Sequence, residues 1–97
     1  MRFDAGTTDI PTAGTRVQVS ALKDKVLWIR FAMRDGNTNE IYVGVDDVAA
    51  NNGWELSTNK RGLELNFQQF GGSILFDKFY VDSDTNGNDV DWVVLLG

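Results

Sequence analysis

The alternation that decides the fold is plainest in residues 27–34, which read LWIRFAMR. The odd-numbered positions are all large and apolar, whereas the even-numbered positions include two arginines. A period of two places successive side chains on opposite faces of a β-strand. This stretch is therefore predicted to be a strand with one face in a hydrophobic core.

The same period appears on both sides of this stretch. Residues 16–21 alternate before the turn LKDK, and they are predicted to form a hairpin with residues 27–33. Residues 83–89, SDTNGND, contain an Asn-Gly turn signal and predict a terminal hairpin between the strands that flank them. The further predicted strands cover residues 40–44, 54–57, 63–67, 74–82 and 90–96.

Seven or eight short strands, with turn signals about every ten residues, predict an all-β sandwich or small barrel with mostly antiparallel strands. A chain of 97 residues suits one domain. Residues 1–15 show no sustained period and are predicted to be an extended N-terminal arm, so the β domain covers residues 16–97. Phe3, Ile10 and Pro11 are the candidate anchors of this arm in a groove of a partner or of the chain itself.

Composition excludes several functions. The chain has neither cysteine nor histidine, so serine–histidine, cysteine–histidine and thiolate metal chemistry are excluded. A net charge of −5 argues against nucleic acid as a partner, and no apolar run is long enough to cross a membrane. The N-terminus lacks a signal-peptide pattern, which predicts synthesis in the cytoplasm.

Acidic residues supply the candidates for chemistry. Glu40 with the pair at 46–47, or Asp89 with Asp91, could be read as an acid–base pair. With 14 carboxylates in 97 residues, such neighbours are expected by chance, and we predict no enzymatic activity, catalytic residue or cofactor. Residues 82–87, DSDTNG, resemble the start of a calcium loop, but Val93 occupies the position of its bidentate glutamate. A plain turn is preferred and no metal site is predicted.

Three tryptophans are many for so short a chain. Trp28 and Trp54 are predicted to face away from the leucine-rich core, as subunit or capsid interface anchors. Two other interpretations stay open. The second face of a sandwich could pack them into an ordinary core, or Trp28, Trp54 or Tyr80 could form the stacking surface of a small carbohydrate-binding module.

From Ile41 onward the sequence resembles small phage virion proteins. The resemblance lies in IYVG at 41–44, in the V-A-x-N-x-G loop at 48–53, in Leu56, in LELNF at 63–67, and in residues 79–92, which fit F-Y-V-D-S-x-x-x-G-x-x-V-x-W. These motifs cover somewhat over half the chain and contain no catalytic residue. The first 40 residues show no matching signature, and the paired aspartates at 46–47 depart from the pattern.

The resemblance implies a capsid decoration, or cement, protein that binds the major capsid protein on the outer surface of the virion and stabilises the head. It also implies a homotrimer. A tail protein, a head-to-tail accessory protein or a fibre base is the alternative within the same class. A carbohydrate-binding module is the alternative from another class.

Overall fold

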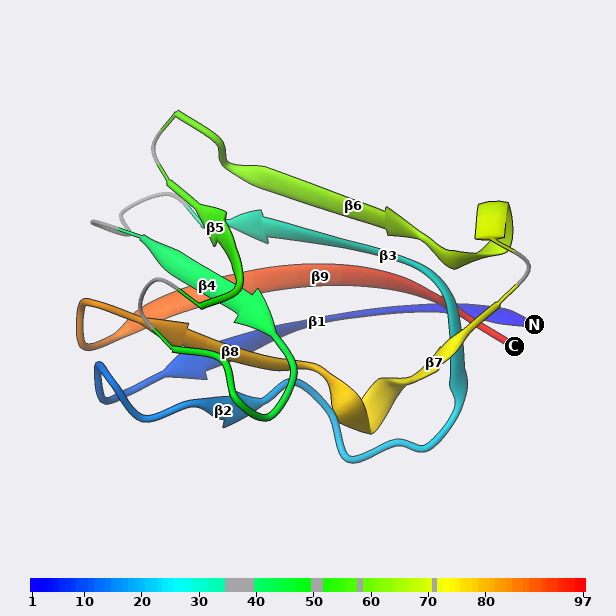
Figure 1. The fold of residues 1–97 in the computed structure, drawn as a ribbon, viewed down its shortest axis with the longest axis horizontal. Helices are drawn as coiled ribbons and strands as arrows, with labels where there is room; N and C mark the ends of the chain where they lie inside the picture. The colour runs from blue at the N-terminus through cyan, green and yellow to red at the C-terminus, as the bar shows by residue number, and fades with distance from the viewer. Residues whose placement is uncertain (35–39, 50–51, 58, 71) are drawn as a thin grey trace.

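The computed structural model describes residues 1–34, 40–49, 52–57, 59–70 and 72–97. Within these residues the chain is a β-sandwich of two packed antiparallel sheets, as the alternation predicted (Figure 1). The strands of the described residues are β1 (Arg2–Ile10), β2 (Val17–Gln18), β3 (Lys25–Met33), β4 (Ile41–Gly44), β5 (Trp54–Leu56), β6 (Gly62–Asn66), β7 (Ile74–Leu75), β8 (Tyr80–Ser83) and β9 (Asn88–Leu96). Two short 3-10 helices, η1 (Phe67–Phe70) and η2 (Phe76–Lys78), flank β7.

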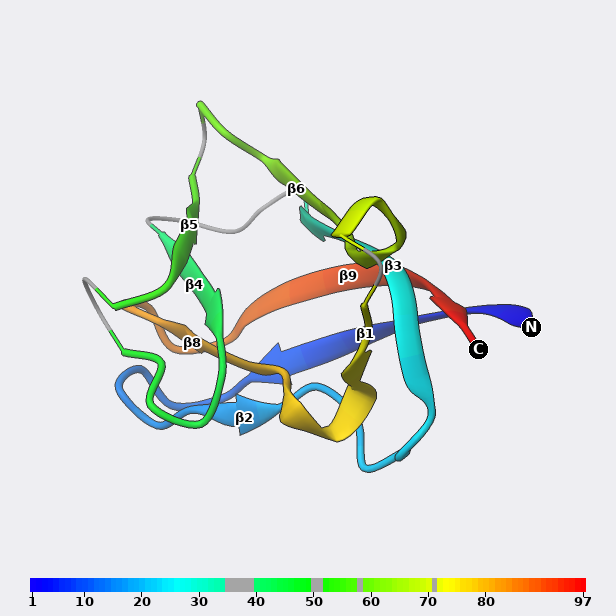
Figure 2. The ribbon, with the colours of Figure 1, turned by 45° about the vertical axis from the view of Figure 1, so that its right-hand side comes forward.

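The larger sheet has the strand order β1-β9-β3-β6, and β7 pairs with the beginning of β3. Its longest pairing joins β1 and β9 from Arg2 opposite Leu96 to Ile10 opposite Asn88. Figure 2 shows these two strands side by side, with both chain termini at the same end of the molecule. The smaller sheet has the order β2-β8-β4-β5 and lies in front of the larger one in Figure 1.

The core lies between the two sheets. Every second residue of β3 is buried from Ile29 to Met33, which is the face that the alternation predicted. Ile41 and Val43 of β4 are fully buried, also as predicted. The buried apolar residues packed in this cluster are Ile10, Val19, Val26, Ile29, Phe31, Met33, Ile41, Val43, Leu56, Phe76, Phe79, Val81, Val90, Val94 and Leu96.

Both predicted hairpins are wrong. Val17 and Gln18 pair with β8 in the smaller sheet, whereas β3 belongs to the larger sheet. Likewise β8 pairs with β2 and β4, and β9 pairs with β1 and β3, so the turn after Ser83 carries the chain from one sheet to the other. Alternation fixes which face of a strand is buried but does not identify its neighbour.

The N-terminal segment is extended, as predicted, but it is a strand of the sandwich and not an arm outside it. Residues 2–10 pair with β9 along their whole length. The backbone N–H of Gly87 also donates to the carbonyl oxygen of Ile10, at 2.9 Å. The core strands therefore begin at Arg2, and the predicted boundary at residue 16 does not separate an arm from the sheets.

Candidate interaction surface

Phe3 and Trp28, two of the five predicted interface residues, lie together on the outer face of the larger sheet. Their ring centroids are 6.4 Å apart and their planes meet at 84°, an edge-to-face contact. The strand register explains this contact, because Phe3 lies opposite Leu95 of β9 and Leu95 lies next to Trp28 of β3. One apolar row therefore crosses three strands.

This row is open to solvent. Phe3 is 70% exposed, and Val93, which lies two residues before Leu95 on the same face, is 43% exposed. Trp28 and Leu95 are half-buried. Single exposed apolar side chains are ordinary on a protein surface, but neighbouring ones form the kind of patch that marks an interaction site. We call Phe3, Trp28, Val93 and Leu95 the Phe3–Trp28 surface.

The same sheet face becomes polar away from the termini. Asp91 accepts a hydrogen bond from the Thr7 hydroxyl at 2.6 Å and lies 3.6 Å from the guanidinium of Arg34. Further along, Asp9 of β1 lies directly opposite Asp89 of β9. The hydrogen bond between these two carboxyl groups, followed by desolvation and by the charge of Asp9, raises the pKa of Asp89. The apolar row is thus bordered by charge on one side.

Of the two alternatives left open for Ile10, the structure shows the contact with its own chain, whereas the role of Pro11 stays a prediction. Ile10 is fully buried in the core of this chain, so its side chain is not available to a partner surface. Pro11 follows β1 and is exposed. The reason is that β1 runs through to Ile10, and the only large apolar side chain at its end turns inward between the sheets.

Trp54 is 48% exposed, as predicted, but it belongs to the other sheet. It lies on β5, opposite Val43 of β4. The structure therefore does not bring Trp54 together with Phe3 and Trp28.

Trp92 packs into the sandwich. Its ring lies over Gly6 of β1, where an added Cβ atom would be 2.5 Å from the indole. The indole N–H donates to the Thr8 hydroxyl at 3.1 Å, and the ring meets Phe76 edge-to-face at 5.1 Å. Of the three tryptophans, Trp92 is the one that packs against the core.

Residues 82–87, which resemble the start of a calcium loop, cover the end of β8 and the turn that leads to the other sheet. Asp82 is buried, and its Oδ1 accepts the backbone N–H groups of Gly14 and Ser83 at 3.1 and 2.8 Å. The side chain of Asn86 accepts the N–H of Ala13 at 2.7 Å. Gly87 has a φ of +82°, the positive value that the turn signal predicted. The hydrogen bonds to Gly14 and Ala13 hold this segment against the connection between β1 and β2.

The carboxyl groups in contact are not the pairs considered from the sequence. Glu40 contacts Asp84, and this hydrogen bond is the main cause that raises the pKa of Glu40. Asp84 also lies 3.4 Å from the Tyr42 hydroxyl, whose pKa is raised chiefly by burial. Among the described residues, no group of three His, Cys, Asp or Glu side chains is arranged to hold a metal ion.

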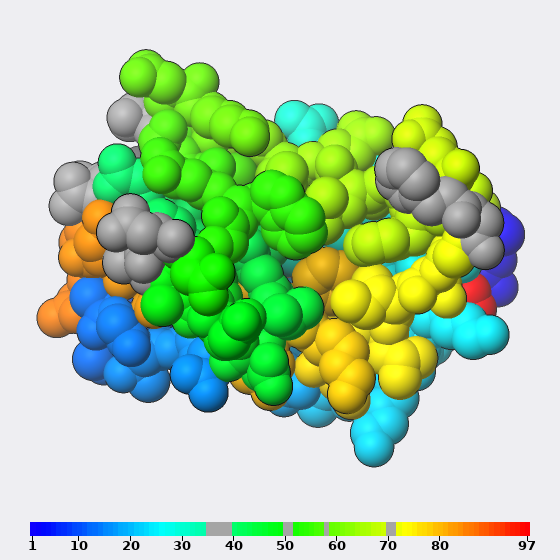
Figure 3. Space-filling model, in the orientation of Figure 1, coloured from blue at the N-terminus to red at the C-terminus, as the bar shows by residue number. Residues whose placement is uncertain are grey.

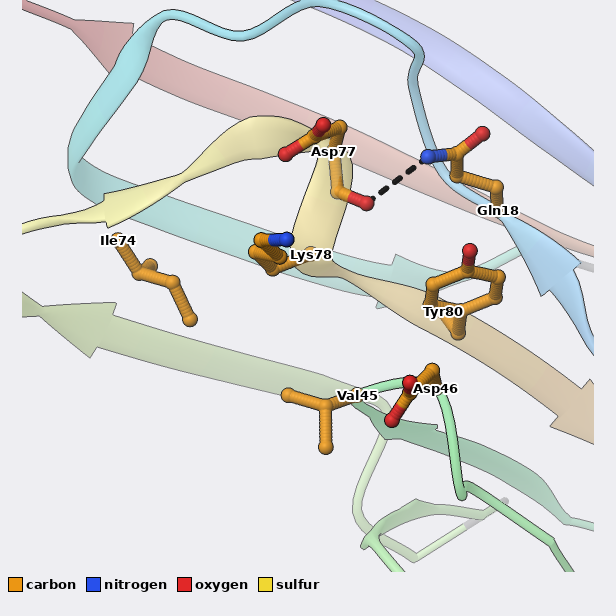
Figure 4. A pocket seen from close by; sticks show the side chains of 7 residues that line it. All are labelled: Gln18, Val45, Asp46, Ile74, Asp77, Lys78 and Tyr80. Carbon is orange, nitrogen blue, oxygen red and sulfur yellow. Dashed lines mark hydrogen bonds between the residues drawn. The ribbon is translucent and has the colours of Figure 1, made fainter.

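A groove of about 420 Å³ lies on the outer face of the smaller sheet. Figure 3 shows this face, which is hollowed between the green segment after β4 and the yellow segment around η2. Within the groove, the side-chain amide of Gln18 donates to the carbonyl oxygen of Asp77 at 2.8 Å (Figure 4). The lining residues are Gln18, Val45, Asp46, Ile74, Asp77, Lys78 and Tyr80.

Sequence reasoning named Tyr80 as a candidate stacking residue but missed its neighbours in this groove. Gln18, Asp46 and Lys78 come from three segments that are distant in the chain. No local motif links them, because the pairing of β8 with both β2 and β4 is what brings them to one place.

No known family model matches this chain, and no curated protein sequence is significantly similar to it. Its described part contains no helix that is long and apolar enough to cross a membrane.

Proposed function

We propose that this protein is a capsid decoration protein of a phage, which binds the major capsid protein on the outside of the head through the Phe3–Trp28 surface. The observation that carries the proposal is the solvent-exposed apolar row that crosses β1, β9 and β3. The resemblance of residues 41–97 to small virion proteins supports the same role.

The apolar row can contribute only a modest binding free energy at each contact, which suits attachment through many equivalent contacts. Complete burial of one large apolar side chain contributes about 1.5–3 kcal/mol, and Phe3 exposes most of its surface. A few such side chains, after the cost of association, give a weak pairwise affinity. Oligomeric attachment at several points makes such binding firm, which is why we include a homotrimer on the particle in the proposal.

Neighbouring strands hold the row in place. Because β9 is paired on both sides, by β1 and by β3, the backbone beneath Leu95 and Val93 is fixed before any partner arrives. A pre-formed surface loses little conformational entropy on binding. In this proposal one face of a folded sheet makes the partner contact that was expected of an extended N-terminal arm.

The test uses heads purified from phage that lack this gene, with the protein added back. The variant Trp28→Ala should weaken attachment by about 2 kcal/mol or more, because tryptophan anchors rank among the strongest interface contributors. Glu64→Ala, on the exposed part of the same face in β6, is the matched control and should attach normally. Attachment that is unchanged in Trp28→Ala and in Phe3→Ala would rule out this surface.

A further inference from the structure

We infer that the groove on the outer face of the smaller sheet binds an uncharged oligosaccharide, with Tyr80 as the stacking surface. This inference is independent of the proposed role of the larger sheet, since the two sites lie on the outer faces of different sheets. Its basis is the combination of one half-exposed aromatic ring with side chains that both donate and accept hydrogen bonds.

The ring of Tyr80 is presented to the groove by the sheet itself. Val81, the next residue, is fully buried, so Tyr80 points to the opposite, outer face. Figure 4 shows the ring with Gln18 beyond its hydroxyl and Asp46 on the other side, while Lys78 lies across the groove. An aromatic ring with polar groups at its edge can hold the apolar C–H face of a sugar and reach its hydroxyl groups.

The polar groups match hydroxyl groups better than a charged ligand. Sugar hydroxyls donate and accept, and the groove offers an ammonium at Lys78, a carboxylate at Asp46 and the side-chain amide of Gln18, whose nitrogen donates to Asp77. Asp46 and Asp77 outnumber the single cation of the lining, and the whole chain carries a net charge of −5. An anion such as a phosphate or a sulfated chain would therefore be repelled.

The strand pairing argues against an extended peptide in this groove. A peptide bound by strand addition needs a free backbone edge. Tyr80 lies opposite Gln18 of β2 on one side and Gly44 of β4 on the other. At Tyr80 the backbone is paired on both sides, so recognition there comes from side chains, which suits a ligand that carries its own hydroxyl groups.

A second hollow lies next to the groove and could hold a second sugar ring. It has a volume of about 250 Å³, shares Val45 with the first hollow, and is lined by Trp54, whose side chain is 48% exposed. Asp47 and Asn52 add polar groups to it. Tyr80 in the first hollow and Trp54 in the second can each stack against one sugar ring. The ligand is therefore an oligosaccharide and not a single sugar.

The experiment is a titration of the full chain, followed by amide NMR shifts and calorimetry. The probes are neutral oligomers of glucose, mannose, galactose and N-acetylglucosamine, each with its monosaccharide, and a sulfated heparin fragment. At least one neutral series should shift the amides of Gln18, Val45 and Tyr80, with an affinity that rises with chain length. The heparin fragment should cause no shift of these amide signals.

Variants locate the binding. Tyr80→Ala should weaken it by about tenfold or more, whereas Tyr80→Phe should keep most of it. Trp54→Ala should abolish the increase in affinity with the length of the oligosaccharide. Gln18→Ala changes an exposed side chain and should reduce affinity with an unchanged thermal melt, which covers the case in which Tyr80→Ala folds poorly.

Two results would overturn the inference: no amide shift with any neutral oligomer up to about 10 mM, or affinity that is equal in wild type, Tyr80→Ala and Gln18→Ala. Phe3→Ala is the control from the other sheet and should bind the oligomers as the wild type does. Conversely, Tyr80→Ala should attach to heads normally. The sugar-binding inference and the proposed capsid contact can therefore be refuted independently of each other.

Discussion

Replacing Ile10 by alanine tests whether β1 is part of the core. Ile10 is fully buried in the cluster between the sheets. The change removes three carbon atoms, at about 0.8 kcal/mol each, and leaves a cavity, so the free energy of unfolding should fall by about 3–4 kcal/mol. For a domain of this size that is a large part of the total stability.

The assay is urea unfolding followed by tryptophan fluorescence, with linear extrapolation to water. Phe3→Ala is the matched control on the same strand, because Phe3 is 70% exposed, and loss of its contact with Trp28 should lower the free energy of unfolding by no more than about 1.5 kcal/mol. Deleting residues 1–11 should leave a chain that is largely unfolded. If Ile10→Ala costs less than about 1 kcal/mol, or the shortened chain melts like the wild type, β1 is a dispensable arm and our description of the sheet is wrong.

Further substitutions test the packing, the turn and the carboxyl pairs. Gly6→Ala should destabilise by about 1–3 kcal/mol in thermal melts, because the new Cβ atom would lie 2.5 Å from the Trp92 ring, whereas Gly72→Ala, with no atom within 4 Å, should be neutral. Gly87→Ala should cost about 1–2 kcal/mol, since its φ is +82°, and a variant as stable as wild type would contradict that backbone conformation. Glu40 has a raised pKa, so the folded state binds its proton more tightly than the unfolded state, and stability should decline as the pH rises above the ordinary glutamate value of 4.5. Asp84→Asn should flatten that decline in melting temperature against pH, and an unchanged slope would show that this pair does not control it.

Local patterns predicted most strands because a half-buried strand repeats every two residues. The pattern in residues 27–34 identified the buried face of β3 correctly, and the short strands β4, β5 and β6 lie close to their predicted ranges. The pairing of strands could not be predicted, because hairpin rules apply only where neighbours in sequence are neighbours in the sheet. Here the connections after β2 and after β8 both cross to the other sheet.

Strand β1 was missed for a physical reason. The positions on the same face as Ile10 include Arg2 and Asp4, which are exposed, and Gly6, so apolar alternation is lost although the backbone is fully paired with β9. Gly6 is there because the Trp92 ring occupies the space that a side chain would need. Periodicity in the sequence cannot reveal a contact between two residues that lie far apart in the chain.

The candidate surface was predicted in part. Phe3 was identified as an apolar residue of the N-terminal segment and Trp28 by strand alternation, and the structure brings them into contact. Their neighbours Leu95 and Val93 were assigned only to a β-rich run, because nothing in that run shows which of its residues face solvent. The sequence left open whether Ile10 contacts its own chain or a partner, since its burial in the core depends on where β1 ends.

Cryo-electron microscopy of phage heads that carry the protein would locate it on the particle and show which of its faces contacts the capsid. We expect density for a small β-sandwich on the outer surface of the capsid, repeated at equivalent positions, with the outer face of the larger sheet and the side chains of Phe3 and Trp28 against the major capsid protein. Density for the domain in the tail or at the head-to-tail junction, or on the capsid with that face turned to solvent, would contradict this expectation.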